Sequence, residues 1–473
     1  MRSLGIDVGT TNVKAVVVEI AEGRATVVAQ ASAPTPAGGR ALQQAVARLV
    51  GEVGTDVAAV GVASMAETGV PLDRDGAPLG DLVRWNPSRA QDHAAALAAT
   101  HGADALFAAT GVRPSGKVPL ATWAQLRDED PGRWEAMARW AGAADLAVLA
   151  LTGRLATDHT LAGRTMAYRL PAPGHPVPEG FDAELLAAVG LRPEQLPEVV
   201  VPGEVAGRVP AGGTWGLRAG TPVVAAGHDH PVGSWAAGVR APGDVADSVG
   251  TAESVVRVLA TRPDPAAVAA AGMSLVRTVE GRDEALVAGS ATAGAVLAWW
   301  AERVGGFAAL APLLDDAAAR PRRADSPLLL PYLRGRQAPS PDPRARAVVV
   351  GDGLDDVELT AAVLDGLALQ ARWMLTAQAE LAGADPAVGE VRVLGSATAG
   401  GSAWLRAKAA AGPAPLRVVG EREAVAVGAA VLAAHRAGLA EPLVLASEPV
   451  GVPREPVYDT LFDRFVSAAP GSA

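Results

Sequence analysis

The sequence predicts an α/β protein of two domains, and three observations lead to this prediction. The chain has 473 residues, which is more than one ordinary hydrophobic core accommodates. Segments with strand character alternate with segments of helical pattern, as in sheets covered by helices. A strand end followed by Gly-Thr occurs twice, at Gly9-Thr10 and at Gly250-Thr251, once in each half of the chain.

The first domain is expected to begin with a β-hairpin. Residues 3–6 and 14–18 are rich in strand formers, and a tight turn over residues 7–11 joins them, with Gly9 permitting the turn. A helix is predicted over residues 41–53 and a buried strand over residues 57–63. This alternation indicates an α/β sheet.

Residues 81–211 have a largely helical pattern, which we interpret as an insertion that shapes a substrate cleft. A short strand over residues 222–226 follows, then Gly-His-Asp-His at 227–230 and a helix to Gly238. The turn at 241–243 is the candidate hinge. We therefore expect an N-terminal domain over residues 1–240, a C-terminal nucleotide-binding domain over 241–440 and a tail over 441–473.

The second domain is expected to repeat the α/β pattern. Strands are predicted over residues 245–249, 254–259, 285–288 and 391–394, a Pro/Arg-rich loop over 331–343 and a long helix over 356–381. The hexapeptide Gly-Ser-Ala-Thr-Ala-Gly occurs at 289–294 and again at 395–400, each time after a predicted strand and before a predicted helix. Two nucleotide-facing loops would explain the repetition, and chance in an Ala/Gly-rich chain is the alternative.

Composition narrows the classes of function. The net charge is −10 and no long Lys/Arg run occurs, which argues against nucleic acid or an anionic membrane as a partner. The chain has no cysteine, so disulfides and thiolate metal sites are excluded. The N-terminus lacks the apolar stretch of a signal peptide, so a cytoplasmic enzyme is expected. Composition does not decide whether the protein forms a homo-oligomer.

Two glycine turns are candidates for binding phosphate. Asp7 ends a predicted strand and could hold Mg²⁺ through water, while the turn after it presents N–H groups and hydroxyls, with Lys14 adding positive charge. The second motif runs from Asp247 to Glu253 and again sets a strand end against a Gly-Thr turn, here Gly250-Thr251. An ordinary Asp-x-Gly turn is the alternative for each, and their occurrence in both halves favours phosphate binding.

Asp229 is the candidate general base. It follows a strand, and open α/β sheets bind ligands beyond the carboxyl ends of their strands, where a carboxylate can take a proton from a hydroxyl. Two alternatives stay open. His228, Asp229 and His230 could together hold a metal ion, and Asp229 could simply be the N-cap of the next helix.

Glu67 follows a buried strand and could accept hydrogen bonds from two adjacent hydroxyls of a polyol, although a surface turn is the commoner role. Trp85 is a cleft-wall or core residue by default. Residues 111–118 match the P-loop spacing except at Val118, where Ser or Thr would bind Mg²⁺. Because a helical stretch precedes this segment, we reject nucleotide binding there.

These motifs in this order resemble the carbohydrate kinase family that includes glycerol kinase, xylulokinase and fuculokinase, known as the FGGY family. The resemblance covers roughly residues 4–440. It rests on the two Gly-Thr turns, on Thr292-Ala293-Gly294 with Trp299 after it, and on residues 393–401, Glu423 and 428–430.

The resemblance implies two ribonuclease H-like domains of the actin and hexokinase superfamily, with a hinged cleft between them. It also implies ATP and Mg²⁺ as cofactors and a small sugar or polyol as substrate. By the same resemblance Asp229 falls on the catalytic base, His230 on a neighbouring substrate contact and Glu67 on a substrate-binding glutamate. We also expect Trp85 to contact the substrate and Asp7 to hold Mg²⁺ through water. The residues expected at the nucleotide are Thr10, Thr11, Asn12, Lys14, Gly250, Thr251, Gly294, Gly395, Ser396 and Gly400.

The chain departs from the family pattern at several positions. Asn86 follows Trp85 where aspartate is common, Arg336-Gln337 replaces Glu-Arg, and Ser396 and Gly400 replace a glycine and an asparagine. These departures leave open which sugar is bound and how the adenine is contacted.

The expected reaction is transfer of the γ-phosphoryl group of ATP to a hydroxyl of a ketose or polyol, with domain closure excluding water. Two rivals use the same fold. A non-catalytic sugar-responsive regulator would carry a basic DNA-binding module ahead of Asp7, where the sequence leaves no room. An actin-like ATPase would have no use for Asp229, His230 and Glu67.

Overall fold

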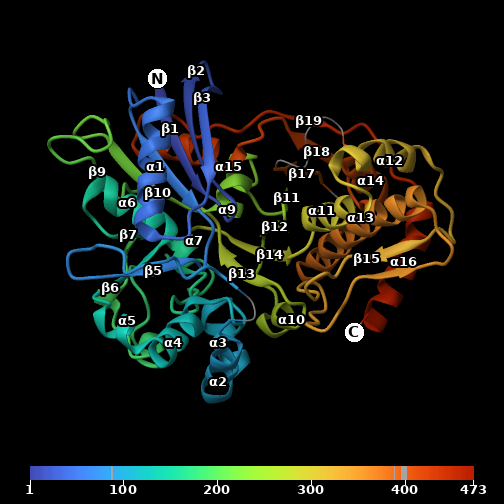
Figure 1. Cartoon of the computed structure of the whole chain (residues 1–473), viewed down its shortest axis with the longest axis horizontal. Helices are drawn as coiled ribbons and strands as arrows, with labels where there is room; N and C mark the ends of the chain where they lie inside the picture. Colours follow the sequence, from blue (N-terminus) through green and yellow to red (C-terminus); the bar gives the residue numbers. More distant parts are fainter. Residues whose placement is uncertain (87–88, 388, 396–401, 473) are drawn as a thin grey trace. The chain divides into compact units, whose positions relative to one another are not determined.

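The computed structural model describes residues 1–86, 89–387, 389–395 and 402–472 of the chain. The chain forms two compact units (Figure 1). Unit 1 comprises Met1–Gly238, Leu275–Glu284 and Glu423–Leu445, and unit 2 comprises Val239–Ser274, Ala285–Arg422 and Ala446–Ala473. The expected boundary at 240 lies close to the first division. The segments 275–284 and 423–440, expected in the C-terminal domain, and residues 441–445, expected in the tail, instead fall in unit 1.

The sheet of unit 1 has a parallel centre with an antiparallel ribbon beside it. β1 pairs antiparallel with β2, β2 antiparallel with β3, and β4 lies parallel between β1 and β10. The order of its strands is β3 (Arg24–Pro34), β2 (Asn12–Ala21), β1 (Arg2–Val8), β4 (Val60–Ser64), β10 (Pro222–His228) and β9 (Gly207–Arg208). The predicted hairpin and both predicted strands are confirmed.

The two faces of this sheet follow the period-2 alternation of β1. Leu4, Ile6 and Val8 belong to a core with α1 (Gly39–Val53) and α6 (Ala143–Thr152). On the other face Ser3 donates to the carbonyl of Ala430 at 2.7 Å, in α15 (Ala424–Arg436), which also packs on α9 (Asp229–Ala236). Figure 1 shows α1 and α15 flanking the sheet.

Glycines set how closely α15 approaches the sheet. A Cβ atom on Gly5 would run into the carbonyl of Ala426, and one on Gly61 would run into the carbonyl of Ala429. The helix backbone therefore lies directly on β1 and β4, because these strand positions have no side chain. This packing explains why residues 423–445 fold with unit 1.

The insertion after β4 is less purely helical than the sequence predicts, because short strands join its helices. It contains α2 (Gln91–His101), α3 (Ala103–Thr110), α4 (Pro119–Glu129), α5 (Pro131–Ala136), α7 (His159–Ala162), α8 (Ala183–Ala187), a 3-10 helix (Pro193–Gln195), and the pairs β5 (Gly69–Leu72) with β6 (Arg139–Gly142) and β7 (Ala156–Asp158) with β8 (Glu198–Val200). Its own core is built around the buried Trp123, which meets Trp140 edge to face.

The sheet of unit 2 repeats this arrangement. β11 pairs antiparallel with β12 and parallel with β17, which is parallel to β18. The strand order is β14 (Glu284–Ser290), β12 (Glu253–Leu259), β11 (Val245–Val249), β17 (Val391–Leu394), β18 (Leu416–Val419) and β19 (Ser447–Pro449), and β13 (Ser274–Arg277) begins where the chain passes back to unit 1. When the edge strands β9, β13 and β19 are left out, both sheets have the order third, second, first, fourth, fifth strand along the chain, which confirms the two ribonuclease H-like domains.

The long helix of unit 2 begins and ends at the predicted residues. It is α13 (Asp356–Leu381), started by the capping box of Asp355 and Glu358, and its Gln378 donates to carbonyls of β12 and β14. The remaining elements are α10 (Pro265–Ala270), α11 (Gly294–Arg303), α12 (Phe307–Ala319), α14 (Ala403–Ala411), α16 (Val457–Ala468), a 3-10 helix (Ala469–Ser472), β15 (Leu328–Leu330) and β16 (Val348–Val350). In the part of the chain that the structure describes, no helix is long and apolar enough to cross a membrane.

Candidate active site

Three strands of unit 1 end level with one another at one edge of the sheet. β4 pairs in parallel with both β1 and β10, and the ends of β1 and β10 both lie opposite Ser64. Asp7 stands just before the end of β1, Glu67 follows β4, and Asp229 follows β10. Because the carboxyl ends of parallel strands meet at one edge, the register brings the three predicted carboxylates to the same edge.

Asp7 lies in β1, one residue before its end, so its predicted place at a strand end is confirmed, whereas the turn predicted over residues 7–11 starts too early. It is directly opposite Lys14 of β2, and the turn consists of Gly9, Thr10 and Thr11. Lys14 Nζ is 2.5 Å from Glu423 Oε2, at the start of α15. The lysine expected at the phosphates is therefore held in an ion pair beside Asp7.

The Asp7 carboxyl is in an environment that disfavours its charge. Burial raises the pKa of Asp7 to about 7, the charge of Asp229 acts in the same direction, and Lys14 opposes both. Its buried Oδ1 atom has no hydrogen-bond partner among the described residues. A hard cation would satisfy this oxygen, so the residues present fit a magnesium site.

The first glycine turn is closed by its own backbone. Gly9 N–H donates to Asn12 O at 3.0 Å, and a Cβ atom on Gly9 would lie 2.9 Å from the same oxygen, so close approach explains the glycine. Thr10, Thr11 and Asn12 are exposed. Trp85, the predicted substrate contact, donates from Nε1 to Thr10 Oγ1 at 3.2 Å and so supports this turn.

Asp229 is the first residue of α9, and His228 occupies the N-cap position, so the N-cap alternative for Asp229 does not hold. Its Oδ1 accepts from the backbone N–H of His230 at 2.7 Å. The same oxygen lies 3.1 Å from Nε2 of His228 and 3.9 Å from Nε2 of His230. The two imidazoles flank the carboxylate.

This setting keeps Asp229 ionised. Burial would raise the pKa of Asp229, but the two imidazoles and the His230 N–H outweigh it and hold the pKa below its usual range. His228, Asp229 and His230 also place one ligand atom each within 4.8 Å of the others, which is the geometry of the metal alternative. The metal alternative therefore stays open for these three residues.

Glu67 lies between two cations with its side chain 10% exposed, so it is not a residue of an ordinary surface turn. Arg164 donates to Glu67 Oε1 from Nε at 3.1 Å and from Nη2 at 2.7 Å, and Lys117 Nζ lies 3.7 Å from that oxygen. Burial would raise the pKa of Glu67, but the charges of Lys117 and Arg164 lower it to about 2. Lys117 comes from the rejected P-loop match, and Arg164 was missed because nothing in the sequence near Glu67 points to it.

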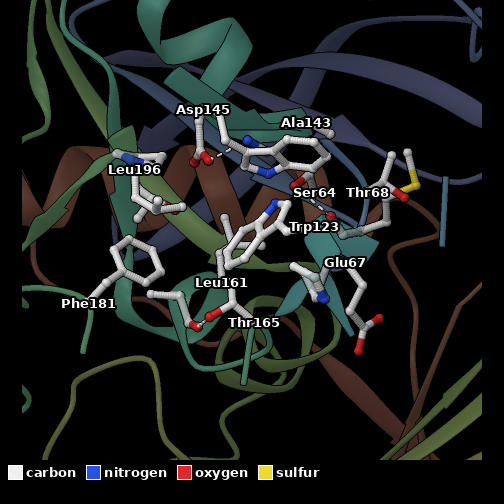
Figure 2. A pocket seen from close by; sticks show the side chains of 18 residues that line it. Ser64, Glu67, Thr68, Trp123, Ala143, Asp145, Leu161, Thr165, Phe181 and Leu196 are labelled. Atoms are coloured by element: carbon white, nitrogen blue, oxygen red, sulfur yellow. Dashed lines mark hydrogen bonds between the residues drawn. The ribbon is translucent and has the colours of Figure 1, made fainter. Parts of the chain in front are cut away.

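A small pocket lies behind Glu67, on the side of the insertion (Figure 2). Its volume is about 40 Å³, which holds a few water molecules and is smaller than a sugar. Asp145 lines it, and burial raises the pKa of Asp145 to about 6. Glu67 lines this pocket as well, but in Figure 2 its carboxylate points away from Asp145.

Three residues of unit 2 that were predicted to bind the nucleotide, Gly250, Gly294 and Gly395, lie close together at the end of β11. A Cβ atom on Gly294 would lie 2.6 Å from Gly250 O, and one on Gly395 would run into the carbonyl of Val249. The first hexapeptide copy lies between β14 and α11, as predicted. Ser396 and Gly400 lie outside the described residues.

The second glycine turn caps a helix with its carbonyl groups. Gly250 O accepts from Gly294 N–H at 3.0 Å, and Thr251 O accepts from the N–H groups of Ala293 and Ala295 at 3.1 Å. These bonds supply acceptors for N–H groups at the start of α11 that have no partner within the helix. The turn and the start of α11 therefore form one rigid piece.

Asp247 lies inside β11, within the strand predicted over residues 245–249. It is fully buried and forms an ion pair with Lys408 of α14, which also pairs with Glu253 at the start of β12. Burial and the charge of Asp247 raise the pKa of Glu253 to about 8, against the opposing charge of Lys408. This buried cluster ties both strands of the hairpin to α14.

Comparison with known proteins agrees with this architecture. The model of the N-terminal domain of the FGGY family of carbohydrate kinases matches residues 3–235, and that of the C-terminal domain matches residues 245–437. The chain therefore belongs to the FGGY family of carbohydrate kinases.

Several relatives are named for different sugars or polyols. The xylulose kinase of Streptomyces coelicolor is 31% identical over 444 residues, which cover 91% of this chain and 87% of that protein. A glycerol kinase of Alkalilimnicola ehrlichii is 29% identical over 297 residues, covering 61% of this chain and 56% of that protein. The crystal structure of a xylulose kinase from Rhodospirillum rubrum has a TM-score of 0.82 at 24% identity and covers 100% of this chain and 98% of that one, which supports the fold.

Proposed function

We propose that the protein transfers the γ-phosphoryl group of ATP to a hydroxyl of a small ketose or polyol, with Asp229 as general base. The observation that carries this proposal is the register of β1, β4 and β10, which sets Asp7, Glu67 and Asp229 at one edge of a sheet. Xylulose kinases among the relatives favour a ketopentose as the acceptor.

In the proposed reaction Asp229 accepts the proton of the attacking hydroxyl at a carboxylate oxygen. Its lowered pKa keeps it ionised at neutral pH, and the N–H of His230 fixes its orientation. The transition state of phosphoryl transfer is loose, so the acceptor proton moves late and a weak base suffices. Asp7 would hold Mg²⁺, which supplies positive charge to the phosphate oxygens.

The substrate panel is the direct test of this proposal. Purified protein with ATP and Mg²⁺ is offered xylulose, other ketoses, gluconate and glycerol, and ADP release is measured. We expect ADP release that depends on the acceptor and is fastest with a ketopentose. Equal ADP release with and without every acceptor would contradict the proposal and favour the ATPase alternative.

Glu67→Gln is expected to weaken sugar binding more than turnover. The change keeps the size of the side chain but removes the charge that Arg164 and Lys117 compensate. A hydrogen bond to a charged group contributes about 1.5–3 kcal/mol, so the KM for the sugar should rise roughly 10- to 150-fold. Steady-state kinetics at saturating ATP measures this.

Asp145→Asn is the control. Asp145 is a buried acid of unit 1 that lines the same pocket as Glu67, but its carboxylate accepts from Gly142 N–H at 2.7 Å, and in Figure 2 the Glu67 carboxylate points away from it. The KM of this variant for the sugar should stay near that of the unmodified protein. If both variants changed the KM equally, Glu67 would have a structural role only.

A further inference from the structure

The backbone that leads into Asp229 rests on side chains from a distant part of the chain. The pairing of β10 with β4 shifts register between Ala225 and Gly227, which marks a bulge just before the proposed base. The N–H of His228 donates to Thr160 Oγ1 at 2.9 Å, across 68 residues of sequence. Gly227 has a φ of 122°, and a Cβ atom there would run into Thr160 Oγ1.

Asp158 fixes the direction of the Thr160 hydroxyl. Its Oδ1 accepts from Thr160 N at 2.8 Å and from Thr160 Oγ1 at 2.6 Å, and its side chain is buried. Because the hydroxyl proton points to Asp158, the lone pairs of Oγ1 are left for the N–H of His228. The hydrogen bond to Asp158 therefore makes the Thr160 hydroxyl an acceptor for the N–H of His228.

Arg436 of α15 holds the other side of the bulge. It donates from Nη1 to Ala225 O at 3.1 Å and from Nη2 to Val279 O at 2.8 Å, and Nη1 lies 3.2 Å from Asp158 Oδ2. Burial would raise the pKa of Asp158, but the charges of His159 and Arg436 outweigh it and hold the pKa below its usual range. The carboxylate is therefore anionic and able to organise both neighbours.

We propose that Asp158, Thr160 and Arg436 are positioning residues that fix the bulge at 225–227 and thereby the orientation of Asp229. This inference rests on the proposed role of Asp229 as base. The network binds backbone groups before Asp229, while the proposed sugar contact Glu67 is held by Arg164 and Lys117. Loss of this network should therefore lower turnover and leave sugar binding nearly unchanged.

Thr160→Val is the main test, because valine has nearly the shape of threonine but accepts no hydrogen bond. We expect kcat to fall about 10- to 100-fold, as misplacement of a reacting group by about 1 Å can cost 10²-fold. The KM for the sugar should change less than about threefold. Thr160→Ser keeps the hydroxyl and should restore most of kcat.

Thr110→Val is the matched control. Thr110 is also buried, donates to Leu106 O at 2.7 Å and accepts from Val112 N–H at 3.3 Å, but it lies in α3 of the insertion. Both variants should lose similar melting temperature, while only Thr160→Val loses kcat. If Thr160→Val does not fold, Thr160→Ala, which cannot crowd the site, takes its place with the same expected kcat loss.

Two outcomes are distinguished by measuring Asp229→Asn in parallel. If Asp229→Asn abolishes turnover while Thr160→Val and Thr160→Ala keep the kcat of the Thr110→Val control, the positioning inference is wrong and the proposed function stands. If Asp229→Asn turns over normally, the proposed base is wrong and the inference falls with it.

Discussion

Asp229→Asn is expected to lower kcat by about 10² to 10⁴, or roughly 3 to 5 kcal/mol of barrier, with sugar and ATP still bound. Asparagine keeps the size of the side chain and an oxygen that can accept from the His230 N–H, but it cannot take a proton. Steady-state kinetics on the best acceptor measures kcat, and calorimetric titration measures sugar binding.

The control for this substitution is Asp264→Asn in unit 2. Asp264 is the N-cap of α10 and accepts from Ala266 N–H at 3.1 Å, so it tests the same chemical change where only a helix end is involved. Asp264→Asn should lose little melting temperature, since asparagine is a good N-cap. Asp229→Asn should also lose little, because the amide oxygen can still accept from the His230 N–H. Unchanged kcat in Asp229→Asn would rule out Asp229 as the base.

Lys408→Met is expected to destabilise unit 2 by about 3–5 kcal/mol, the usual cost of removing one partner from a buried ion pair. Lys408, Asp247 and Glu253 are all at most 4% exposed, so water cannot replace the lost cation. The melting temperature of unit 2 should fall by roughly 6 to 20 °C. Thermal unfolding followed by circular dichroism measures the shift.

The loss of stability in Lys408→Met should also depend on pH. Burial and Asp247 already raise the pKa of Glu253 to about 8, and removal of Lys408 takes away the charge that opposes them. An acid whose pKa is raised in the folded state binds protons more tightly there, so the stability of Lys408→Met should fall as the pH rises. The difference in free energy of unfolding between Lys408→Met and the unmodified protein should be larger at pH 8 than at pH 5.

Arg154→Met is the control for the buried cluster. Arg154 pairs with Glu198 at 2.8 Å, and the two side chains are 51% and 61% exposed, so its removal should cost little and show no such pH dependence. A Lys408→Met variant as stable as this control at pH 8 would contradict the assigned role of Lys408.

The local sequence pattern predicted much of the secondary structure. The helix α13 and the strands β11 and β17 have the predicted bounds, because apolar periodicity and caps depend on residues close in sequence. The candidate carboxylates Asp7, Glu67 and Asp229 were found because each stands at or just after a strand end. That the two glycine turns bind one nucleotide stays a prediction.

The position of Asp7 was not predictable in the same way. Asp7 lies inside β1, because the hairpin with β2 continues its pairing up to Val8, whereas Asp247 lies in β11 as predicted. The sequence around this aspartate, Asp7, is compatible with either a strand residue or a turn residue. Only the register of the partner strand decides between them.

The sequence by itself determined the class of fold and the order of the motifs, because both follow from contacts between near neighbours. Only the tertiary structure decided the partners of the charged groups: Arg164 pairs with Glu67 across 97 residues, and Lys408 with Glu253 across 155. It also placed α15 on the sheet of unit 1, where Gly5 and Gly61 leave room for its backbone. Such contacts depend on which surfaces meet in the folded chain, and no pattern of neighbouring residues specifies that.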